Sequence, residues 1–124
     1  MVDEGKDLVE IVKGVFDLPL ALSVGLSSAF GLVLGSFAGA LEFDISSDLL
    51  PLGYVIPAFT MLFGAGSHVG NALQDGDYSS MGPKERLVDV GSAIAIHYGT
   101  NCMAYNISYA LGNSVFHVVN KVLK

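Results

Sequence analysis

The stretch Leu18–Leu41, LPLALSVGLSSAFGLVLGSFAGAL, contains no charged residue and is bounded by Asp17 and Glu42. A helix of about 20 apolar residues crosses the roughly 30 Å hydrocarbon core of a bilayer, so this stretch is long enough to span a membrane. The chain has 124 residues, of which 52% are hydrophobic and only 15% charged, a low charge content for a soluble domain. The stretch therefore predicts a membrane-spanning helix.

Two further charge-free stretches follow, from Leu49 to Gln74 and from Val90 to Asn120. Each is again long enough to cross a bilayer, and we expect spans at about 49–73 and 87–112. Together with 18–41 this gives three transmembrane helices. Because 124 residues have the size of one domain, we expect an all-α integral membrane protein in which 1–124 form a single helical membrane domain.

Short amphipathic helices are expected at both ends of the chain. Apolar residues alternate with charges from Val2 to Phe16, the pattern of a helix that lies at a membrane surface. The third charge-free stretch is longer than a bilayer requires, and Gly112-Asn113 is its expected break. Residues 114–124 would then form a second amphipathic helix.

Basic residues near the ends of the spans predict the orientation of the chain. Four of them lie on the side of the amino terminus and two on the other side: Lys6, Lys13, Lys84 and Arg86 against Lys121 and Lys124. The positive-inside rule therefore places the amino terminus in the cytoplasm or the mitochondrial matrix. The expected membrane is the prokaryotic plasma membrane or the mitochondrial inner membrane.

Glycines at helical spacing predict close helix packing. Gly31, Gly35 and Gly39 form a GxxxGxxxG run, which removes the side chains from one face of the first span and lets another backbone approach. The later spans repeat this pattern more weakly, at Gly66 and Gly70 and at Gly91, Ala95 and Gly99.

The third span carries polar side chains on two nearly opposite faces. His97 and Asn101 share one face, whereas Asn106 and Asn113 fall on the other. Unsatisfied polar atoms are costly in hydrocarbon, so both faces need partners. We expect Asn106 and Asn113 to contact protein or water, and the chain to work with other membrane subunits or with copies of itself.

The sequence has no P-loop, nucleophile elbow or CxxC pair, and its net charge of −6 argues against nucleic-acid binding. No catalytic residue and no metal site is predicted, and the chain is not expected to be an enzyme alone. His68 and His97 lie within predicted spans, where a histidine is a functional candidate. Each could instead be a neutral side chain hydrogen-bonded between helices.

The end of the second span resembles the membrane anchor of succinate dehydrogenase, the cytochrome b small subunit. The resemblance rests on His68, Gly70 and Asp77-Tyr78, on their spacing, and on the three-span layout, with His68 two residues after the ligand position of the family. It implies a non-catalytic anchor subunit of a respiratory oxidoreductase. It also implies haem b ligation by His68 and ubiquinone binding by Tyr78 and Asp77.

A second resemblance is to large-conductance mechanosensitive channels, through the amphipathic amino terminus, the glycine-rich first span and the phrase Ile96-His97-Tyr98-Gly99. It implies a channel. The glycine and asparagine residues themselves favour the alternative function, a self-assembling channel or structural membrane subunit packed through glycine faces and an asparagine-lined third helix. An insertion or assembly factor without a ligand site is a third alternative.

Overall fold

The computed structural model describes residues 4–42 and 52–123, and helices make up nearly all of this part of the chain. In chain order the elements are α1 (Glu4–Gly14), α2 (Leu18–Leu41), α4 (Leu52–Gln74), the 3₁₀ helix η1 (Asp77–Ser80) and α5 (Pro83–Leu123). No strand occurs within 4–42 or 52–123, so the predicted all-α class is confirmed.

Helix α2 has the bounds predicted from its charge-free sequence. Asp17 caps its start, since the carboxylate accepts a hydrogen bond from the backbone N–H of Leu20 at 3.1 Å. Pro19 lies in the first turn, where a missing N–H costs nothing. Glu42 ends the helix in a left-handed conformation with φ of 55°. Helix α4 ends within one residue of the prediction, whereas its expected start at 49 lies outside the described residues.

The predicted break at Gly112-Asn113 is wrong, and so is the separate terminal helix. Helix α5 continues through this point and has 41 residues, a length of about 60 Å. Gly112 lets α2 pack closely against α5, because a Cβ at this position would lie 2.7 Å from the carbonyl oxygen of Leu32 and from the hydroxyl of Ser36. Contact with α2 therefore supports the helix where the isolated sequence suggests an end.

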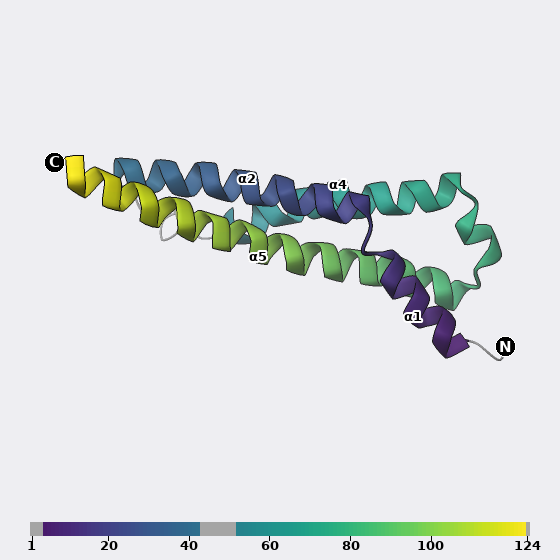
Figure 1. The fold of residues 1–124 in the computed structure, drawn as a ribbon. Coiled ribbons are helices and arrows are strands. Elements are labelled where there is room, and N and C mark those ends of the chain that lie inside the picture. Colours follow the sequence, from purple (N-terminus) through teal and green to yellow (C-terminus); the bar gives the residue numbers. More distant parts are fainter. Residues whose placement is uncertain (1–3, 43–51, 124) are drawn as a thin grey trace.

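The three long helices form a staggered bundle. Helices α2 and α5 run parallel and α4 runs antiparallel to both, with α1 and η1 at one end of the bundle (Figure 1). Asn106 of α5 bonds to Gly53 near the start of α4, whereas Asn120, about 20 Å further along α5, bonds to Glu42 at the end of α2. Of the described helices, three lie side by side in the middle of the bundle, and α2 and α5 continue together towards the carboxyl terminus.

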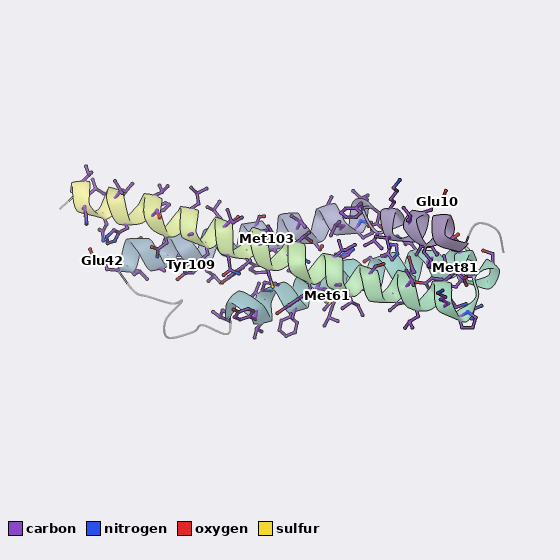
Figure 2. The ribbon with its side chains drawn as sticks, turned by 90° about the horizontal axis from the view of Figure 1, so that it is seen from below. Glu10, Glu42, Met61, Met81, Met103 and Tyr109 are labelled. Carbon is purple, nitrogen blue, oxygen red and sulfur yellow. The ribbon has the colours of Figure 1, made fainter. Side chains whose placement is uncertain are left out.

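Polar side chains lie inside the bundle and large apolar ones lie outside. Ser23, Ser27, His97 and Asn101 are fully buried, whereas Phe59, Leu62, Phe63, Met103 and Ile107 are each at least 60% exposed. Figure 2 shows Met103 midway along α5, with Glu10 and Met81 at one end of the bundle and Glu42 at the other. Among the described helices, α2 and α4 are long and apolar enough to cross a membrane, and α5, which contains the predicted third span, is not one of them.

Candidate functional site

His68 lies between two carboxylates where three helices meet. Its Nδ1 is 2.5 Å from Oδ2 of Asp17, the residue that caps α2, and its Nε2 is 2.9 Å from Oδ1 of Asp89 in the second turn of α5. The His68 and Asp89 side chains are buried, and that of Asp17 is 27% exposed. The helices therefore hold one imidazole between two acids at the amino-terminal end of the bundle.

The two short contacts determine how many protons this group holds. A neutral imidazole carries one N–H and ionised carboxylates carry none, so a neutral ring can donate only one of the two hydrogen bonds. Both contacts are hydrogen bonds only if the ring of His68 is an imidazolium or if Asp17 or Asp89 is protonated. The group is thus arranged to hold one transferable proton.

Tyr78 joins the same group through Asp89. Its hydroxyl donates a hydrogen bond to Oδ2 of Asp89, so both oxygens of that carboxylate are engaged. Burial, together with this hydrogen bond and the negative charge beside it, raises the pKa of the Tyr78 hydroxyl above its ordinary value. Tyr78 therefore stays neutral and acts as a donor that orients Asp89.

The local sequence explains why Tyr78 reaches α5. Gly76 adopts a φ of 75°, a left-handed conformation that glycine enters without strain, and turns the chain from α4 into η1. The Nε of Arg86, in the first turns of α5, then donates to the backbone carbonyl of Tyr78 at 2.9 Å. These two features fix η1 against the start of α5.

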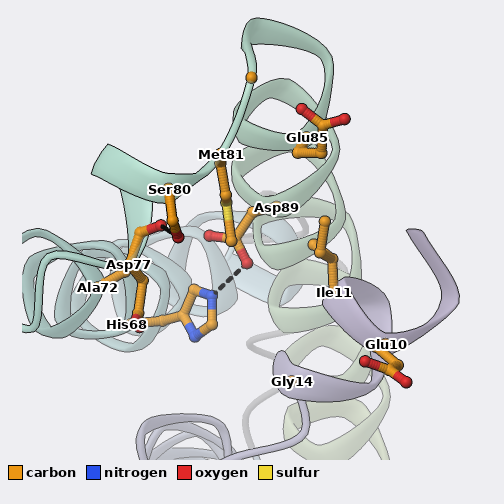
Figure 3. A pocket seen from close by; sticks show the side chains of 11 residues that line it. Glu10, Ile11, Gly14, His68, Ala72, Asp77, Ser80, Met81, Glu85 and Asp89 are labelled. Atoms are coloured by element: carbon orange, nitrogen blue, oxygen red, sulfur yellow. Dashed lines mark hydrogen bonds and ion pairs between the residues drawn. The ribbon is translucent and has the colours of Figure 1, made fainter. Parts of the chain in front are cut away.

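A pocket of about 700 Å³ lies beside His68 and Asp89. Figure 3 shows these two side chains on one side of it and α1, with Glu10 and Ile11, on the other. The lining combines acidic and hydroxyl groups with apolar ones: Glu10, Ile11, Gly14, His68, Ala72, Asp77, Ser80, Met81, Gly82, Glu85 and Asp89. Such a mixture suits a ligand with a flat apolar body and a few polar atoms.

The structure brings together two of the three residues that the sequence predicted for this site. His68 and Tyr78 meet through Asp89, while Asp77 is exposed and lines the pocket without a bond to either of them in the described contacts. The sequence analysis missed Asp17 and Asp89. Their positions in the sequence could have identified them, because each is the last charged residue before a charge-free stretch.

Haem ligation by His68 would require one of its nitrogens to give up a carboxylate. An iron ligand needs a ring nitrogen with a free lone pair, and both nitrogens of His68 lie within hydrogen-bond distance of a carboxylate. The described residues also include no group of three or more His, Cys, Asp or Glu side chains arranged to hold a metal ion.

The glycine run of α2 lies against α5. A Cβ at Gly31, Gly35 or Gly39 would collide with a backbone carbonyl of α5. The carbonyls belong to Tyr105, Tyr109 and Asn113, in that order. The two backbones therefore touch over two turns of helix, and Asn113 takes part through its main chain.

Asn106 faces α4 rather than α2. Its side-chain amide donates to the backbone carbonyl of Cys102 at 2.8 Å and to that of Gly53 at 3.3 Å. Its side chain is nonetheless exposed at the surface of the bundle. One of its two donor contacts therefore stays within α5 and the other ties α5 to α4.

In comparisons with known proteins, the chain matches no family model, no curated protein and no solved structure.

Proposed function

We propose that this chain is a three-span integral membrane subunit that binds a quinone headgroup in the pocket beside His68 and Asp89. In this proposal it is the non-catalytic anchor of a respiratory oxidoreductase of the succinate dehydrogenase type. The observation that carries the proposal is the proton-holding group Asp17–His68–Asp89 at the wall of the pocket.

The distribution of side chains supports membrane insertion. A bundle in water buries its large apolar residues, but here Phe59, Leu62 and Met103 face outward, while serines, histidines and an asparagine share the interior with mostly small apolar residues. Helix α5 lies beside α2 and α4, the two helices long and apolar enough to cross a membrane. Residues 87–112 would form the third span within α5.

The proton-holding group and the apolar side chains of the pocket support a quinone as its ligand. Reduction of a quinone adds two electrons to the ring and one proton to each carbonyl oxygen. A quinone oxygen that takes the place of one of their contacts can receive the proton shared by Asp89 and His68. The second proton would come from water or from a partner subunit, because the Ser80 hydroxyl already donates to the backbone carbonyl of Asp77. Ile11, Ala72 and Met81 offer apolar contact to the ring. The electrons must come from a partner subunit, because the chain itself has no predicted electron carrier.

The position of the pocket agrees with docking of such a partner. Glu10 of α1 and Asp77 of η1 both line it, so it lies between α1 and the 3₁₀ helix that follows α4. Three of the basic residues that predict the cytoplasmic or matrix side, Lys13, Lys84 and Arg86, belong to α1 and the start of α5 at this end. Soluble, electron-carrying subunits would bind there.

Calorimetry tests the quinone site directly. We would titrate the full chain in lipid nanodiscs with a short-chain ubiquinone analogue. Asp89→Asn keeps the shape of the side chain but removes one of the two carboxylates that favour a protonated His68. The quinone oxygen then loses a charged donor, so we expect affinity to fall at least about tenfold, the value of one charge-assisted hydrogen bond. Asp75→Asn, in the exposed turn after α4, is the matched control and should leave affinity unchanged. Equal affinities in all three proteins would contradict the quinone site.

Open glycine faces favour self-assembly as the second candidate function. Gly91 and Gly99 of α5 are exposed, with nothing of the described chain within 4 Å of a Cβ built on them. Ala95 lies between them on the same exposed face, so another helix could pack closely there. Light scattering of the purified chain in detergent separates the candidates, since a uniform homo-oligomer that binds no quinone would favour self-assembly.

A further inference from the structure

A second polar cluster lies nearer the middle of the bundle than the Asp17–His68–Asp89 group does. Ser23 follows Asp17 along α2 by about 9 Å of helix, and His97 and Asn101 of α5 face it. All three side chains are fully buried. Gly64 of α4 makes room for them, because a Cβ at that position would collide with His97 and Ser23.

The hydrogen bonds of Ser23 fix the protonation of its neighbours. Its hydroxyl donates to the carbonyl of Leu20 at 3.0 Å, so its oxygen is left as an acceptor. Nδ2 of Asn101 donates to that oxygen at 3.3 Å, and Nδ1 of His97 lies 3.5 Å from it. These contacts favour a His97 ring that carries its proton on Nδ1 and presents the lone pair of Nε2.

Two acceptors in this cluster have no partner. Nε2 of His97 and Oδ1 of Asn101 are buried and accept no hydrogen bond from the described residues. The two residues are one helical turn apart on the same face of α5. Buried acceptors without donors are costly, and a water molecule supplies two hydrogens and is the usual solution in protein interiors.

We propose that a water molecule bound between His97 and Asn101 extends the Asp89–His68–Asp17 group into a proton path from the pocket to the middle of the bundle. The path goes beyond quinone binding and does not depend on it. A proton that arrives through water forms a bond with the Nε2 lone pair of His97 and gives an imidazolium that keeps its Nδ1–H on Ser23. The reverse step returns the proton to water.

The first turns of α2 join the two groups. Asp17, the partner of His68, accepts from the backbone N–H of Leu20, and the carbonyl of Leu20 accepts from the Ser23 hydroxyl, which lies beside His97. Because like charges repel in the interior of the bundle, a proton on His68 disfavours a second proton on His97. One proton would occupy either histidine in turn, which is the behaviour of a relay rather than of a fixed ion pair.

Nitrogen-15 NMR of histidine-labelled full-length protein in nanodiscs tests the path. We expect His97 as the Nδ1–H tautomer with a magnetisation-exchange cross-peak to water, and His117, exposed on α5, as the internal reference. Asp17→Asn keeps the cap of α2 but cannot accept a proton, so the exchange between His97 and water should slow markedly. Glu42→Gln removes a carboxylate at the far end of α2 and should leave the exchange between His97 and water unchanged.

An Nε2–H tautomer of His97, or a His97 ring without exchange to water, would overturn the water site. Exchange that is equally fast in Asp17→Asn and in the unmodified protein would overturn the link to the pocket. Circular dichroism of each variant confirms that the helices are intact. Because no quinone is present, failure of this test is distinct from failure of the proposed quinone site.

Discussion

The two ends of α2 contact α5 in different ways. At the carboxyl-terminal end Gly31, Gly35 and Gly39 let the two backbones touch, and no proton-transferring group is needed there. At the amino-terminal end Asp17 joins a buried network with His68 and Asp89, and a pocket adjoins it. The difference indicates that one end of α2 serves the packing of two helices. The other end carries ionisable groups that helix packing alone does not require.

Removing Asp89 should have the largest effect on stability. Asp89→Ala leaves His68 and the Tyr78 hydroxyl buried without their shared acceptor, and we expect the free energy of unfolding to fall by about 3–5 kcal/mol. Unfolding of the detergent-solubilised protein by denaturant measures it. Asp75→Ala, an exposed acid in the turn after α4, should change it by less than about 0.5 kcal/mol. Similar losses in the two variants would mean that the network does not stabilise the bundle.

A methyl group on the glycine face should have the next largest effect. In Gly35→Ala the new Cβ meets the backbone of Tyr109, so α2 and α5 must move apart at a cost of about 1–3 kcal/mol. Gly25→Ala makes the same chemical change on the open face of the same helix, where nothing lies within 4 Å of the new Cβ. We expect Gly25→Ala to be neutral or slightly stabilising. A loss in Gly25→Ala as large as that in Gly35→Ala would contradict the assigned packing face.

A smaller effect concerns the titration of Tyr78. Its raised pKa means that the folded protein holds the phenol proton more tightly than the unfolded chain does. This stabilisation is present below the ordinary pKa of 10.0 and is lost as the pH rises through the higher pKa of the folded state. The ultraviolet difference between the unmodified protein and Tyr78→Phe should therefore show no ionisation of Tyr78 up to pH 10. A midpoint at or below 10 would show that Tyr78 does not donate to Asp89.

The sequence predicted individual helices better than their contacts. The bounds of α2 could be predicted because charges flank an apolar stretch at Asp17 and Glu42. The continuity of α5 could not be predicted, because a glycine such as Gly112 favours the end of a helix. Only the packing of α2 against Gly112 explains why the helix continues. Likewise His68 was a candidate from the sequence, but its bond to Asp89 depends on how α4 and α5 align, which no local pattern specifies. That alignment also engages both nitrogens of His68, so haem ligation by His68 would break one of the two contacts.

Labelling of the single cysteine tests membrane insertion most directly. Cys102 lies midway along α5 and is only partly covered by the bundle, so in the proposed membrane subunit lipid would shield the rest of it. We predict that a membrane-impermeant maleimide leaves Cys102 unmodified in intact vesicles and reacts once the protein is unfolded in detergent. Ser79→Cys in a Cys102→Ser background, exposed beside the pocket, should react without detergent when its side of the membrane is accessible. Equally rapid labelling of Cys102 and of the Ser79→Cys variant in intact vesicles would contradict a membrane-embedded bundle.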